Sequence, residues 1–178
     1  DESIIPSVQL FNEYFGGGMA GLVFQELREA RALAYSAWAR FFTPSRPNEE
    51  NVLVGSIGCQ ADKTLDAVDA FLGLLKQMPL NENRWSSAHS SLLSNYRTNP
   101  LTSRAIPRFV YDVDALGLKM DPREDRFEKL TRATLKSLGD FYTSKIQPRP
   151  ILFSIVGDSE KIDMQALEKL GQVNSVQA

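Results

Sequence analysis

The chain has 178 residues, of which 43% are hydrophobic and 24% charged, a balance typical of a folded domain and not of a disordered segment. Its formal net charge is -2 and no cluster of lysine and arginine stands out, so we expect no nucleic-acid partner. No apolar run approaches the roughly 18 residues that a membrane-spanning helix needs, and the acidic start lacks the basic region of a signal peptide. We therefore expect a soluble chain with no membrane partner and no targeting segment, in a compartment that the sequence does not identify.

A pair of short helices and a glycine run open the chain. Residues 6–16 and 20–31 carry apolar side chains at helical spacing, which predicts a helix over each range. Between the two helices stand Gly16, Gly17 and Gly18, which have two interpretations: a cradle for phosphate, or a hinge or turn that lets the backbone adopt positive φ. Neither of the usual glycine-rich nucleotide motifs is present, and this favours the hinge or turn.

The next elements are a hairpin and two longer helices. Residues 34–42 and 51–59 are rich in β-branched and aromatic side chains, and the polar segment between them predicts the loop of an antiparallel pair. Apolar spacing then predicts a helix that Asp62 caps and that ends before Pro79, and another over residues 83–98.

The second half is mainly helical and closes with one apolar strand. Residues 103–116 and 126–146 carry helical patterns, and a short helix is expected around residues 164–170. Residues 151–156 are apolar on both faces, which predicts a covered central strand. Because strands and helices do not alternate, we expect an α+β fold with an antiparallel or mixed sheet covered by helices.

The chain lacks the residues for an ordinary metal or hydrolase site of its own. It contains one histidine, His89, and one cysteine, Cys59, which are too few to bind zinc in the usual way. We expect His89 to flank the core, and no GxSxG motif accompanies the serines. The sequence therefore predicts no cofactor, no metal and no catalytic residue in this chain, and no activity for the chain alone.

Arg28 and Tyr35 are the candidate binding residues. Arg28 has no carboxylate three or four positions away, and Tyr35 follows seven residues later, at the start of the expected strand. A guanidinium offers a fork of donors to carbonyls or carboxylates, and a phenol can donate to an oxygen that gains negative charge. On residue chemistry alone, a solvated arginine and a tyrosine at the edge of the core remain the alternative.

The stretch from Asn12 to Tyr35 carries a resemblance to a known family. It reads N-x-x-F-G-G-G-M-x-x-x-x-F-x-E-L-R-E-x-x-x-L-A-Y and resembles the pitrilysin, insulysin and mitochondrial processing peptidase family of inverted zinc metallopeptidases. The similarity continues through the hairpin, the helix after it and residues 151–163. The resemblance implies a clamshell of related α+β domains, with His-x-x-Glu-His and a downstream glutamate around zinc in another domain. Residues 1–178 resemble a single C-terminal domain of this kind, one that binds no zinc.

The resemblance also implies functions for this domain. Arg28 and Tyr35 match the family positions that hold the peptide substrate and stabilise the transition state, while zinc belongs to a partner domain or subunit. The alternative is a structural or interaction domain that has lost proteolysis. Since the strands that normally precede the first helix do not fit before Pro6, we expect a fragment of a longer chain without its first strands. We also expect an exposed sheet edge, which offers a route to a homodimer.

Overall fold

The predicted hairpin is confirmed as the central element. The computed structural model of the protein describes residues 2–44, 49–147 and 149–176. Strands β1 (Ser36–Phe42) and β2 (Val52–Gly58) pair antiparallel, with Ser36 opposite Gly58 and Phe42 opposite Val52. Side chains of β1 are alternately exposed and buried, because one face of the hairpin is covered and the other is not. Residues 45–48 of the expected loop lie outside the described residues.

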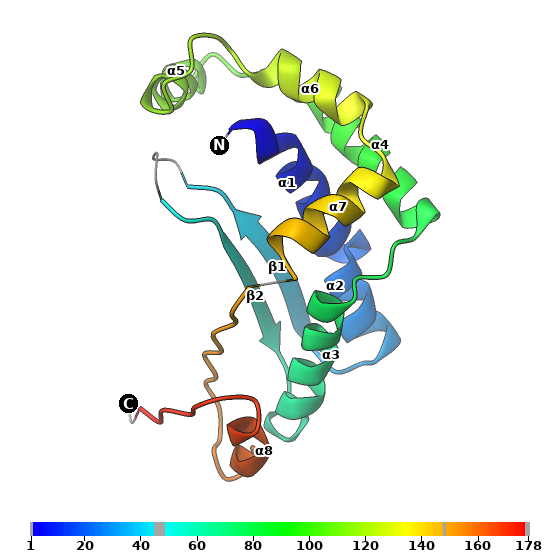
Figure 1. Cartoon of the computed structure of the whole chain (residues 1–178), viewed down its shortest axis with the longest axis vertical. Coiled ribbons are helices and arrows are strands. Elements are labelled where there is room, and N and C mark those ends of the chain that lie inside the picture. The colour runs from blue at the N-terminus through cyan, green and yellow to red at the C-terminus, as the bar shows by residue number, and fades with distance from the viewer. Residues whose placement is uncertain (1, 45–48, 148, 177–178) are drawn as a thin grey trace.

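Helix α1 (Ile5–Phe11) is covered on both sides, by the hairpin and by later helices. Most of the helices lie on one side of the two strands in Figure 1. The Phe11 ring stacks on Phe15 with a centroid distance of 5.0 Å and lies 5.6 Å from the ring of Phe141 on α7 (Leu135–Lys145). Phe11 and Phe15 are fully buried. This aromatic cluster ties the start of the chain to its second half.

Two turns of π-helix distinguish the first 30 residues from ordinary helices. The first continues α1 over Asn12–Gly16, and the second, Gln25–Ala30, continues the short helix α2 (Leu22–Phe24). Helical spacing predicted both segments as helix, but it does not distinguish α from π turns. Turns of π-helix are rare and are found frequently at functional sites.

The helix before the glycines closes one edge of the sheet. Asn12 donates from Nδ2 to the Phe41 carbonyl oxygen over 2.9 Å, and its Oδ1 accepts from the Phe41 amide over 2.7 Å. A Cβ atom at Gly16 would collide with the carbonyl oxygen of Ala39, so only glycine fits there. The main-chain N–H and C=O groups of Phe41 bond to Asn12 and so point away from β2. Because this direction alternates from residue to residue along a strand, the main-chain groups of Ala39 also point away from β2.

Helices α3 (Thr64–Lys76) and α4 (Glu82–Thr98) confirm the two long helices, but the expected cap of the first is wrong. Asp62 lies inside a short 3₁₀ turn that leads into α3, and no side chain caps that helix. The cap is at the next helix, where the Arg84 amide donates to Asn81 Oδ1 over 3.0 Å. A polar residue ahead of an apolar run therefore indicated the right helix but not the way in which that helix begins.

The expected helical segment over residues 126–146 is divided in two. Helix α6 (Arg123–Thr131) and helix α7 are separated where Thr134 and Ser137 form a reciprocal capping box, which starts a new helix. Before them, α5 (Ile106–Ala115) matches the expected helix but has no buried residue. The short final helix α8 (Met164–Glu168) is also confirmed.

The prediction of a covered central strand over residues 151–156 is wrong. These residues form no helix or strand, and the side chains of Leu152 and Val156 are 95% and 99% exposed. An apolar pattern predicts burial only where a neighbouring strand supplies hydrogen bonds and cover, and within the described residues the sheet consists of β1 and β2. The α+β class is nevertheless confirmed, as a helix-rich fold with a small antiparallel sheet. Among the described helices none combines the length and apolar character needed to cross a bilayer.

Candidate substrate-binding site

The structure places Arg28 and Tyr35 on either side of one turn. Arg28 lies in the π turn Gln25–Ala30, and Tyr35 lies one residue before β1. Ala32, which lies between them, adopts a positive φ of 49°, and the chain turns there from the helix towards β1. Ala34, the residue before Tyr35, is buried. In the part of the chain that the structure describes, no hydrogen bond or ion pair joins Arg28 to Tyr35.

Tyr35 combines a fixed main chain with a free side chain. Its amide donates to the Gly58 carbonyl oxygen over 2.7 Å, which ties it to the end of β2. The side chain is 86% exposed, and no hydrogen bond engages its hydroxyl within the described residues. A large aromatic side chain held at its base and open to solvent is available to a ligand.

Arg28 has two close neighbours in the structure, of which helical spacing indicates one. Its guanidinium carbon lies 4.8 Å from the centroid of the Phe24 ring, and its Nε lies 3.8 Å from Glu29 Oε1. The expected absence of a carboxylate three or four positions away holds, but the adjacent Glu29 supplies a loose partner. Phe24 lies four residues before Arg28, and this spacing was the available signal.

The three glycines occupy a tight turn, and the hinge itself stays a prediction. Gly16 lies against β1, and a side chain on Gly17 would collide with the carbonyl oxygen of Glu13. Gly18 has a φ of 59° and open space around it. Glycine is favoured there by the backbone conformation and not by lack of space for a side chain. Two of the three positions are thus fixed by packing.

His89 lies beside the core. Its ring stacks on Trp85 with a centroid distance of 4.7 Å, and its Nε2 lies 2.7 Å from the Leu130 carbonyl oxygen. Across residues 2–44, 49–147 and 149–176, no group of three or more histidine, cysteine, aspartate or glutamate side chains is arranged to bind a metal ion.

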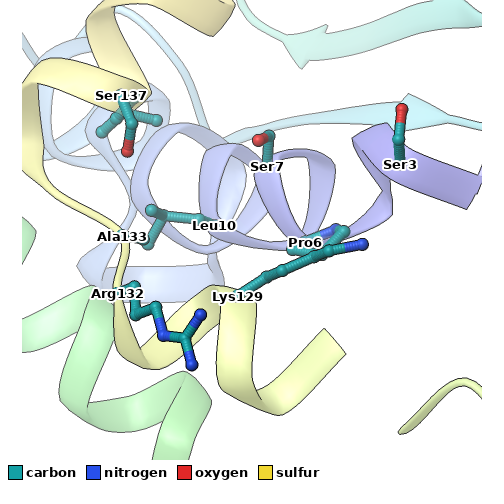
Figure 2. A pocket seen from close by; sticks show the side chains of 9 residues that line it. Ser3, Pro6, Ser7, Leu10, Lys129, Arg132, Ala133 and Ser137 are labelled. Carbon is teal, nitrogen blue, oxygen red and sulfur yellow. The ribbon is translucent and has the colours of Figure 1, made fainter. Parts of the chain in front are cut away.

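A small pocket of about 260 Å³ lies between α1 and the junction of α6 and α7. Figure 2 shows two of its lining residues, with the Lys129 side chain running towards Pro6 of α1 and the Arg132 guanidinium pointing away from that helix. Both cations already have partners, because Lys129 pairs with Asp125 over 2.7 Å and Arg132 with Glu128 over 3.2 Å. None of its lining residues belongs to the stretch from Asn12 to Tyr35.

A wider groove of about 760 Å³ runs along the ends of α4, α5 and α6. Arg123 donates from Nε to Asp121 Oδ2 over 2.8 Å, and this hydrogen bond holds the pKa of Asp121 below its ordinary value. Arg126 is paired with Glu2. With two of its arginines neutralised by carboxylates, this groove is a weaker candidate for an acidic ligand than the exposed Arg28 and Tyr35.

Comparison with known proteins identifies the family. The family model described as the peptidase M16 inactive domain matches residues 5–97, more than half of the chain. No curated protein sequence matches.

Three solved structures are similar in fold. The peptidase M16 inactive domain from Pseudomonas fluorescens is 18% identical with a TM-score of 0.64, over 79% of this chain and 34% of that one. A conserved protein from Enterococcus faecalis V583 is 17% identical with a TM-score of 0.63, over 79% and 33%. A protease from Helicobacter pylori is 12% identical with a TM-score of 0.59, over 78% and 34%. At these identities the likeness concerns the fold.

The chain spans about a third of the length of these solved structures. The family model covers the two helices with the glycine turn, the hairpin, α3 and nearly all of α4. The family expected from the stretch between Asn12 and Tyr35 is thereby confirmed: the chain belongs to the peptidase M16 inactive domain family.

Proposed function

We propose that this chain is the substrate-binding half, without zinc, of a zinc metalloendopeptidase that degrades or processes peptides. It completes the active-site chamber opposite a zinc-bearing domain or subunit of the same family. The observation that carries the proposal is the state of Tyr35, whose main chain is fixed to β2 while its side chain is 86% exposed and unbonded within the described residues. A side chain kept in this way is available to a partner outside the chain.

Arg28 and Tyr35 supply two complementary kinds of donor. The Arg28 side chain is 44% exposed and offers several N–H groups to the carbonyls or carboxylate of a peptide. The Tyr35 hydroxyl can donate to the oxygen that becomes negative when water attacks the scissile carbonyl. The zinc ion, the general base and the activated water would all belong to the other half.

The partners follow from the same proposal: a peptide, and the zinc-bearing half. A homodimer would use the edge of β2, because Asn12 and Gly16 occupy the edge of β1. The β2 sequence carries no charged residue, and charges are the usual protection of an exposed edge.

The alternative function is a structural or interaction domain without a role in proteolysis. In that case Arg28 and Tyr35 are exposed side chains with no ligand, as many surface residues are. Their presence together in the matched motif favours the substrate-binding function.

Substitutions in the complete protein with its zinc-bearing half distinguish the two functions. We expect Arg28→Ala and Tyr35→Phe each to lower kcat/KM by about 100-fold or more, as loss of one oxyanion donor does. Arg31→Ala and Tyr111→Phe, at exposed positions outside the proposed pair, are matched controls and should leave turnover unchanged. Near-normal turnover in both Arg28→Ala and Tyr35→Phe would establish the structural alternative instead.

A further inference from the structure

The Arg28 guanidinium lies over an aromatic ring that is itself held in place. Phe24 ends α2 and is half-buried, and its neighbours Leu22, Val23 and Leu27 are all buried. The distance of 4.8 Å from the guanidinium carbon to the ring centroid is within the range of a favourable cation–π contact. A cation over a ring face uses none of its N–H donors in that contact, so the fork remains available to a ligand.

The second neighbour of Arg28 is held much less firmly. The 3.8 Å between Arg28 Nε and Glu29 Oε1 exceeds hydrogen-bond length, and the two side chains are 44% and 54% exposed. Exposed pairs of this kind are weak, because water competes for both charges. An incoming carboxylate or carbonyl can therefore displace Glu29 while the ring contact persists.

We propose that Phe24 is the positioning residue of Arg28 and that Glu29 is the group which a bound peptide displaces. The inference rests on the proposed function and adds to it how Arg28 is held before the peptide binds. The guanidinium stays over Phe24 and exchanges a carboxylate of its own chain for an oxygen of the substrate. The ring reduces the motion of a long side chain before binding, which lowers the entropy lost when the peptide binds.

Substitutions of Phe24 and of Glu29 should have effects of opposite sign on substrate binding in the complete protein with its zinc-bearing half. Phe24→Leu keeps an apolar side chain but removes the ring, and should lower kcat/KM about two- to fivefold, the size of an exposed cation–π contact. Phe24→Tyr restores the ring and should restore the rate. Glu29→Gln frees the guanidinium and should raise affinity for an uncleaved fluorescent peptide, by up to about fivefold.

A double-substitution cycle separates positioning from folding. In the Arg28→Ala background, Phe24→Leu should cause no further loss, because the group that the ring positions is gone. Phe109→Leu is the matched control, since Phe109 is also half-buried and carries Arg123 at the same 4.8 Å. It should leave both turnover and peptide affinity unchanged.

The outcomes distinguish this inference from the proposed function. Normal turnover with Arg28→Ala refutes the substrate-binding function, whatever Phe24 does. Impaired turnover with Arg28→Ala and normal turnover with Phe24→Leu overturns the positioning role alone. An equal loss from Phe24→Leu with and without Arg28 also overturns it, because the effect is then structural. Unchanged or weaker peptide affinity with Glu29→Gln refutes the exchange.

Discussion

Replacing Asn12 tests how far the edge of β1 depends on one side chain. Asn12 satisfies both the amide and the carbonyl of Phe41, over 2.7 and 2.9 Å. Asn12→Ala leaves two main-chain groups without partners beside a buried side chain. Each unsatisfied buried group costs about 1–3 kcal/mol, and because this contact is only partly buried we expect the free energy of unfolding to fall by about 2–4 kcal/mol.

Asn12→Asp is the matched variant, because it keeps the size and one of the two bonds. The carboxylate still accepts from the Phe41 amide but places a second oxygen against the Phe41 carbonyl, so the folded state favours the protonated acid. The pKa of the new carboxyl is then raised on folding. The hydrogen bond from the protonated carboxyl to the Phe41 carbonyl oxygen is present at low pH and is lost as pH rises. The free energy of unfolding that Asn12→Asp loses relative to the wild type should therefore shrink as pH falls towards about 4.

Two measurements check the expectation. Denaturant unfolding gives the change in free energy, and hydrogen exchange of the Phe41 amide reports the edge directly, since a broken bond speeds its exchange. Unfolding of Asn12→Ala within about 0.5 kcal/mol of the wild-type value, with unchanged exchange at Phe41, would refute the reasoning.

Two further predictions concern packing and charge. Gly16→Ala drives a methyl group into the Ala39 carbonyl and should cost at least about 1–3 kcal/mol, while Gly73→Ala in α3 meets no atom within 4 Å and should stabilise by about 0.5–1 kcal/mol. Equal changes in the unfolding midpoint of the two variants would contradict this difference. The lowered pKa of Asp121 contributes stability above the ordinary aspartate pKa, near pH 4, which is lost as pH falls through the folded pKa. Arg123→Ala should raise that pKa in an NMR titration, and an unmoved value would show that the Arg123 hydrogen bond is not the cause.

The sequence predicts best where a local pattern alone determines the structure. The hairpin, α3 and α4 follow their apolar periods, because each element buries one face against a core that many residues share. The motif between Asn12 and Tyr35 led to the family because it is also a local pattern, whose length and residue order are specific.

Prediction failed where the outcome depended on partners distant in sequence. Residues 151–156 have the composition of a covered strand, but composition does not supply a neighbour for pairing. Asn12 was recognised as part of the motif, yet its bonds to Phe41 join residues 29 positions apart and follow only from the fold. Glu29 was missed as a partner of Arg28 because helical spacing considers positions three and four away, whereas the contact is to the adjacent residue.

The closed edge of β1 limits how copies of this domain can associate. Fibrils and open-ended chains of strands grow only when every copy offers two edges, one to receive a strand and one to present it. Within the described residues Asn12 and Gly16 occupy the edge of β1, so pairing between copies of this sheet would use the edge of β2. Two copies that met there would each use the edge of β2, so association through these strands would end at a pair and would not propagate.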